Sequence, residues 1–207
     1  MTKIISADEI KKSFKGYDPK KVENYHKKSA KLADKEFDGV LKDDRFWRII
    51  LMNGGTASGK TEFLSEYLFD YKGVVFDGTL STVLGAKIKI RKILKKNKTP
   101  IVYSVIPDDL KRAFIAFLHR DRKFSDIHFY KTHSGSREVL LWIAKNYPKV
   151  KLMVYKSIYD KKDKMIFKKL YFDSRKEKIK YLETIQIKEN NLVKFINYKN
   201  ERNNFKT

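Results

Sequence analysis

Residues 54–61 carry the side chains and glycines that hold phosphate groups. Gly54, Gly59, Lys60 and Thr61 fit the pattern Gly-x-x-x-x-Gly-Lys-[Ser/Thr]. Glycines permit backbone conformations that bring amide N–H groups close to phosphate oxygens. Lys60 is expected to reach the β- and γ-phosphates of ATP or GTP, and the Thr61 hydroxyl to bind Mg²⁺. The predicted nucleotide-binding residues are Gly54, Gly55, Thr56, Ala57, Ser58, Gly59, Lys60 and Thr61.

The elements on either side of this loop are those that a phosphate-binding loop requires. Residues 47–52 form a short apolar run that predicts a buried strand ending just before the loop. After the loop, Phe63, Leu64, Tyr67 and Leu68 recur at helical spacing, so the predicted helix would direct its positive N-terminal end at the phosphates. The alternative is a glycine turn with a purely structural role.

Phosphoryl transfer also needs an acidic group to orient the attacking hydroxyl or to hold the metal. Asp77 ends a predicted strand at residues 73–77, and ligands of parallel sheets bind beyond the carboxyl ends of the strands. Asp77 is therefore the predicted acid, with a turn or N-cap aspartate before Gly78 as the alternative. Asp108 and Asp109 are predicted to lie at the N-cap and first turn of a helix instead.

Positive charge for the transferred phosphoryl group is predicted to come from residues 117–137. This polar segment contains Arg120, Arg122 and Arg137 in a chain whose basic residues are mostly lysine. Arginine can bind phosphate through two parallel hydrogen bonds, which lysine cannot. We therefore expect a loop between two helices that covers the phosphates, although each arginine alone also fits a surface role. His133 is expected to be structural or to lie at a helix start.

The order of the elements predicts the fold class. Apolar strands alternate with amphipathic helices, which is typical of a parallel sheet covered on both faces. We predict a three-layer α/β fold of the P-loop NTPase or kinase type. The strands are expected at residues 47–52, 73–77, 101–106 and 150–155, and helices at 80–96, from 108 and at 136–146.

Three regions are expected along the chain. Residues 1–45 form an N-terminal helical extension, residues 46–160 a kinase-like core and residues 161–207 a basic C-terminal extension. Ser6 and Pro19 are the helix-start signals of the first region. The last region contains β-favouring stretches at 165–172 and 192–198, and both a packed and a loosely ordered arrangement fit its composition.

Composition narrows the expected partners and location. The 207 residues include no cysteine, no segment resembling a signal peptide and no apolar run long enough to cross a membrane. We expect a cytoplasmic protein. Its formal net charge of +22 favours polyanionic partners, so weak, non-specific nucleic-acid binding is expected, while solvated surface lysine is the simpler explanation of the charge.

The combined motifs resemble the zeta-toxin family of P-loop kinases across about residues 45–156. The shared features are the loop at 54–61 followed by Glu62-Phe63-Leu64, the sequence Asp77-Gly78-Thr79-Leu80, and the arginine segment. The resemblance implies ATP- and Mg²⁺-dependent phosphorylation of a hydroxyl, as on a UDP-amino sugar, with Lys60 and Thr61 at ATP and Mg²⁺. It also implies that Arg120 or Arg122 acts with Arg137 as a phosphate clamp, and that an antitoxin-like protein is a possible partner.

One feature departs from that family. Its members have an additional strand, carrying the catalytic base, between the helix after the loop and the acidic-Gly-Thr-Leu element, whereas here Tyr71 leads directly to Val74. Either Asp77 performs both tasks, or substrate and rate differ, or the chain binds nucleotide with little transfer. The alternatives to a small-molecule kinase are a nucleic-acid-binding or polynucleotide-phosphorylating protein and a reduced, toxin-like interaction protein.

Overall fold

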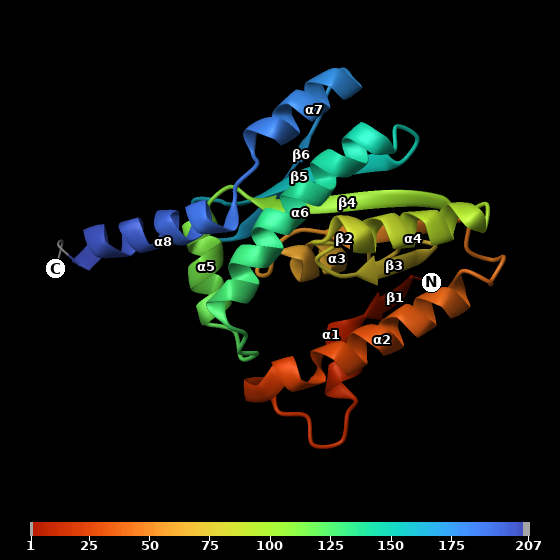
Figure 1. Ribbon diagram of the computed structural model, residues 1–207, viewed down its shortest axis with the longest axis horizontal. Helices are drawn as coiled ribbons and strands as arrows, with labels where there is room; N and C mark the ends of the chain where they lie inside the picture. The colour runs from red at the N-terminus through yellow and green to blue at the C-terminus, as the bar shows by residue number, and fades with distance from the viewer. Residues whose placement is uncertain (1, 205–207) are drawn as a thin grey trace.

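The computed structural model describes the backbone of residues 2–204 and the side chains of residues 2–197. It is an α/β fold with a six-stranded sheet in the order β1-β3-β2-β4-β5-β6 (Figure 1). The strands are β1 (Lys3–Ser6), β2 (Arg48–Asn53), β3 (Val74–Asp77), β4 (Thr99–Pro107), β5 (Lys151–Tyr159) and β6 (Met165–Leu170). The α-helices are α1 (Ala7–Lys12), α2 (Val22–Val40), α3 (Lys60–Tyr67), α4 (Val83–Lys95), α5 (Leu110–Leu118), α6 (Asp126–Asn146), α7 (Arg175–Thr184) and α8 (Glu189–Asn204), with a 3₁₀ turn at Pro19–Lys21.

The predicted parallel arrangement is confirmed. β2 pairs in parallel with both β3 and β4, and β4 pairs in parallel with β5. β6 is antiparallel to β5, so the sheet is mostly but not entirely parallel. The carboxyl ends of the parallel strands therefore lie at one edge of the sheet, the edge where the 54–61 loop leaves β2.

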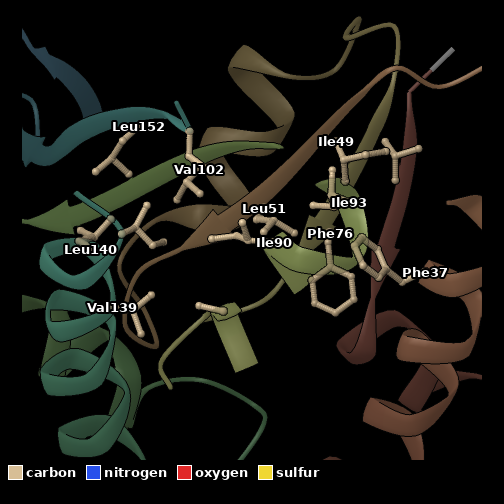
Figure 2. Packing of buried hydrophobic residues seen from close by; sticks show 14 of the residues in the cluster. Phe37, Ile49, Leu51, Phe76, Ile90, Ile93, Val102, Val139, Leu140 and Leu152 are labelled. Atoms are coloured by element: carbon tan, nitrogen blue, oxygen red, sulfur yellow. The ribbon is translucent and has the colours of Figure 1, made fainter. Parts of the chain in front are cut away.

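The sheet is buried on both faces because alternate side chains of its strands point in opposite directions. Ile49 and Leu51 of β2 point to the face that packs against α4 and α6, shown by Ile90 and Leu140 in Figure 2. The intervening residues Ile50 and Met52 point to the opposite face, where Phe63 of α3 packs. This explains why the strand sequences are continuous apolar runs and do not alternate between apolar and polar residues.

The N-terminal region differs from the helical prediction because residues 3–6 form a strand. β1 pairs in parallel with β3, with Ile5 opposite Phe76 and Ser6 opposite Asp77. Ile5 is fully buried in the main core, so this short strand is stabilised by packing rather than by its own length. As a result, the start of the chain reaches the same sheet edge as the 54–61 loop.

Two further segments differ from their predicted structure. α6 begins at Asp126 rather than at residue 136, so much of the expected polar loop is helical. Phe129 and Val139 are both fully buried, which shows that packing stabilises this long helix. The β-favouring stretch 192–198 lies inside α8, where Leu192 and Ile196, four residues apart, share one buried face against α5 and α6.

Within residues 2–204, no helix combines the length and the apolar composition needed to cross a membrane.

Candidate active site

The 54–61 loop connects β2 to the start of α3, and two of its glycines have positive φ. Gly54 has a φ of +141° and Gly59 a φ of +89°, a region that other residues rarely adopt. A Cβ atom on Gly54 would also lie 2.4 Å from the carbonyl oxygen of Val105. The loop conformation thus requires glycine at two of the positions that the sequence pattern fixes.

Lys60 lies over the loop that precedes it. Its Nζ atom donates hydrogen bonds to the carbonyl oxygens of Gly54 at 2.9 Å and Gly55 at 2.7 Å. Burial lowers the pKa of Lys60 to about 8, and the nearby Asp77 carboxylate opposes that shift. A half-buried ammonium that has no ion pair with a carboxylate among the described residues is well suited to an anionic ligand.

A pair of side chains from α6 holds the loop at Thr56. The Thr56 N–H donates to Oγ1 of Thr132 at 3.1 Å, and the Thr56 carbonyl lies 2.8 Å from Nε2 of His133. Gly55 makes this contact possible, because a Cβ there would lie 2.3 Å from the His133 ring. His133 is fully buried in the middle of α6, not at a helix start, and its role is to position the loop.

Asp77 lies where the sequence predicts, at the end of β3 and beside the loop. Its carboxylate accepts a hydrogen bond from Ser6 Oγ at 3.2 Å. The N-cap of the following helix is Thr82, so the alternative role of Asp77 as a cap is wrong. Burial raises the pKa of Asp77, whereas Lys60 lowers it.

These groups line one pocket of about 600 Å³ at the carboxyl edge of the sheet. Eight of the predicted site residues line it, namely residues 56–61 of the loop, Asp77 and Arg120. The volume is within the range of small-molecule sites. Residues of the first two helices also line it, among them Asp8, Lys11 and His26, which the sequence does not identify as site residues.

The structure separates the three predicted lid arginines. Arg120 lies in the segment between α5 and α6 and lines the pocket, and its charge lowers the pKa of Lys60. Arg122 forms an ion pair with Asp8. Arg137 is buried within α6, is not among the pocket-lining residues, and donates to the His133 carbonyl at 2.8 Å. Its expected position in a flexible phosphate-covering loop is therefore wrong.

Burial determines the pKa values of Arg137 and His133, which contact each other within α6. Burial lowers the pKa of Arg137 to about 10, and burial together with Arg137 keeps the pKa of His133 well below its usual value. A neutral His133 donates from Nε2 to Thr56, which leaves Nδ1 to accept from Arg137 Nη1 at 3.3 Å. Arg137 thus fixes the ring that fixes the loop.

The structure confirms the predicted role of Asp109 at the start of a helix. It also contains a buried polar residue beside the loop, Asn53, that the sequence motifs do not identify. Asp109 caps α5 by accepting from the N–H groups of Lys111 and Arg112. Asn53, fully buried just before the loop, donates to the carbonyls of Leu80 and Ser136. A buried asparagine at the end of an apolar strand is the signal that could have identified it.

Comparison with known proteins supports the fold. No family model matches the chain, and no curated protein matches it. The chain is similar to the crystal structure of the AvrRxo1-ORF1:-ORF2 complex in its native form, with a TM-score of 0.50, 10% identity, and coverage of 77% of this chain and 72% of that chain. A structure of AvrRxo1-ORF1:AvrRxo1-ORF2 with sulphate ions matches with a TM-score of 0.49 and 10% identity over 73% and 68% of the two chains. At this identity the likeness concerns the α/β fold alone.

The residues present fit a nucleotide with Mg²⁺. The positive φ of Gly54 and Gly59 sets the path of the loop, and loop residues 56–61, Lys60 and Thr61 among them, line the pocket. Among the described residues, no group of three or more His, Cys, Asp or Glu side chains forms a metal site. Mg²⁺ in phosphate-binding sites is commonly held by one or two protein oxygens together with phosphates and water. Among the oxygen-bearing side chains that line the pocket, Thr61 at the start of α3 and Asp77 at the end of β3 would be the ligands.

Proposed function

We propose that this protein is an ATP- and Mg²⁺-dependent phosphotransferase that acts on a hydroxyl group of a small molecule, such as a UDP-amino sugar. The observation that carries the proposal is the meeting of Lys60, Thr61, Asp77 and Arg120 around one pocket at the carboxyl edge of a mostly parallel sheet. Phosphoryl transfer depends mainly on positioning and on charge stabilisation, and these groups supply both.

Each residue has a distinct task in this proposal. Lys60 exchanges its hydrogen bonds with the Gly54 and Gly55 carbonyls for the nucleotide phosphates. Thr61 and Asp77 would hold Mg²⁺, which would supply positive charge to offset that of the nucleotide phosphates. Arg120 takes the task predicted for the lid. Of the three arginines it is the one that lines the pocket, its charge lowers the pKa of Lys60, and it forms no ion pair with Asp8 among the described contacts.

Resemblance to the zeta-toxin kinases supports the reaction type, and it carries a proposal about partners. The solved structure of similar fold is that of a complex, AvrRxo1-ORF1:-ORF2. By analogy we propose that an antitoxin-like protein binds this chain.

The decisive experiment is ATP turnover against a panel of UDP-sugars, nucleosides and 5′-hydroxyl oligonucleotides, with products identified by mass spectrometry. A phosphorylated small molecule is the expected product. Lys60→Ala should abolish its formation while the protein stays folded, because within the described part of the chain the Lys60 ammonium donates hydrogen bonds to its own loop only. Phosphorylation of oligonucleotides alone would overturn the small-molecule assignment, and absence of nucleotide binding would overturn the proposal as a whole.

A further inference from the structure

We propose that the acceptor hydroxyl binds on the wall of the pocket formed by α1 and the segment between α5 and α6, and that Asp8 is the catalytic residue that orients it. This inference rests on the proposed phosphotransferase function. It assigns the acceptor site to the start of the chain, before the phosphate loop. It also separates the two tasks of an acid, with Asp77 at the metal and Asp8 at the acceptor.

The topology of the sheet brings Asp8 to the site. β1 is parallel to β3 and in register with it, with Ser6 opposite Asp77. The chain leaves β1 at the same edge where it leaves β2 and β3, so Asp8 in the first turn of α1 faces the phosphate pocket. The two acids are near enough that the Asp8 charge acts on both Asp77 and Lys60.

Asp8 is held by two cations from different elements. Its Oδ1 atom accepts from Lys11 Nζ at 2.9 Å, and its Oδ2 atom is paired with Arg122. Although burial opposes ionisation, Arg122 and Lys11 hold the pKa of Asp8 at about 2, so the carboxylate is charged at neutral pH. Each oxygen retains a lone pair for a further donor, and the side chain is 40% exposed, whereas the Lys11 side chain is 1% exposed.

This arrangement suits an acceptor hydroxyl and leaves Arg120 for the phosphoryl group. The Asp8 carboxylate accepts a hydrogen bond from the hydroxyl and directs its oxygen at the γ-phosphorus. As the new O–P bond forms, the bond from the γ-phosphorus to the bridging oxygen of ADP breaks, and ADP leaves with the bond's electron pair. The hydroxyl proton passes to Asp8 and then to water. A weakly basic carboxylate suffices because the hydroxyl becomes acidic as the bond forms, and alignment is its main contribution.

The test compares Asp8→Asn with Glu9→Gln, since Glu9 is the neighbouring acid of α1 and pairs with exposed Lys12. Each full-length variant is incubated with γ-labelled ATP and either UDP-N-acetylglucosamine or a dialysable metabolite extract, and product is quantified. ADP affinity and the melting temperature are measured in parallel. We expect Asp8→Asn to lower product formation by about 10²–10⁴-fold. ADP affinity should stay within a few-fold, and Glu9→Gln should behave like the parent.

Because Asp8→Asn leaves Lys11 buried without a carboxylate, a second variant guards against loss of folding. Asp8→Asn with Lys11→Met removes both charges of the pair, and it should fold and bind ADP yet remain inactive. If either folded variant transfers phosphate at the parent rate, Asp8 is not the acceptor residue and the phosphotransferase function stands. If the parent protein itself yields no product although it binds ADP, the proposed function fails, and this inference fails with it.

Discussion

The Nε2 atom of His133 lies 2.8 Å from the carbonyl oxygen of Thr56, so a neutral imidazole in α6 holds the backbone of the 54–61 loop. The same helix accepts the Thr56 N–H through Thr132, which satisfies both backbone groups of that residue. Arg137 in turn holds the His133 ring. Buried contacts therefore fix the loop before any nucleotide binds. This lowers the entropic cost of ordering the loop, which nucleotide binding would otherwise have to offset.

Replacing His133 tests whether its contact with the Thr56 carbonyl orders the loop. His133→Phe keeps a ring against Gly55 but leaves the Thr56 carbonyl without its donor, so it should lower the free energy of unfolding by about 1–3 kcal/mol. His133→Gln retains an N–H group near the position of Nε2 and should recover part of that loss. Urea denaturation and ADP titration measure both effects. Equal ADP affinity in the parent, Phe and Gln proteins would show that the contact between His133 and Thr56 does not order the binding loop.

Adding a methyl group to Gly55 tests the same contact from the other side. Gly55→Ala would place a Cβ 2.3 Å from the His133 ring, which must move. We expect destabilisation of about 1–3 kcal/mol and weaker nucleotide binding. The control is Gly39→Ala in α2, where no atom lies within 4 Å of the added Cβ, and a gain of about 0.5–1 kcal/mol is expected. Combining Gly55→Ala with His133→Ser should be less damaging than the sum of the two changes, as measured by a double-mutant cycle.

The sequence predicts the parallel core well because its signals are local. The strand at 47–52, the glycine pattern and the amphipathic helix after it are adjacent in the chain, so each supports the others. Asp77 is found for the same reason, since it directly ends a strand. Asp8 is missed because its position depends on the pairing of β1 with β3, about seventy residues away, and the short strand before it contains no sequence signal of that pairing.

The length of α6 explains why the predicted position of Arg137 in a phosphate-covering loop is wrong. The polar residues 131–137 look like a loop, but every third or fourth position of α6 is buried against the sheet or the 54–61 loop. Thr132, His133 and Ser136 are polar and yet fully or almost fully buried, because each has a hydrogen-bond partner. Thr132 and His133 contact the backbone of Thr56, and the Ser136 hydroxyl donates to the His133 carbonyl of the same helix. Hydrophobic periodicity cannot detect a helix face whose buried residues are polar.

The pH dependence of nucleotide binding tests the state of Lys60. Since the unliganded protein has a Lys60 pKa of about 8, its charge is present below that pH and is lost above it. ADP affinity should therefore fall above pH 8, by up to tenfold per pH unit, until the pKa of the bound state is reached. Isothermal titration from pH 7 to pH 10 measures the slope. In Lys60→Met the affinity should be low and free of this slope.

Folding stability should respond to pH in the opposite direction. Between pH 8 and 10.5 the unfolded chain keeps the Lys60 proton that the native protein has released, so the Lys60 contribution to the free energy of unfolding rises with pH. The comparison of parent and Lys60→Met in urea isolates that contribution. A parent protein whose ADP affinity and relative stability are both flat across this window would contradict the burial of the Lys60 ammonium.

Replacing Arg120 and replacing Arg137 are predicted to affect different properties of the protein. Arg120 lines the pocket, so Arg120→Ala should lower turnover by about 10²–10³-fold with ADP affinity within a few-fold and an unchanged melting temperature. Arg137→Ala removes a buried guanidinium that holds His133, so it should lower the melting temperature and weaken ADP binding together.

Steady-state kinetics and thermal denaturation of both variants separate a cation that acts on the transferred phosphoryl group from one that positions the loop. Lys123→Ala is the matched control for Arg120→Ala, because Lys123 belongs to the same segment but is exposed and donates only to the Leu118 carbonyl among the described contacts of its side chain. If Arg120→Ala turns over like Lys123→Ala, the cation that stabilises the phosphoryl group is not Arg120. Lys131 of α6 is then the next candidate, because its exposed side chain also lines the pocket.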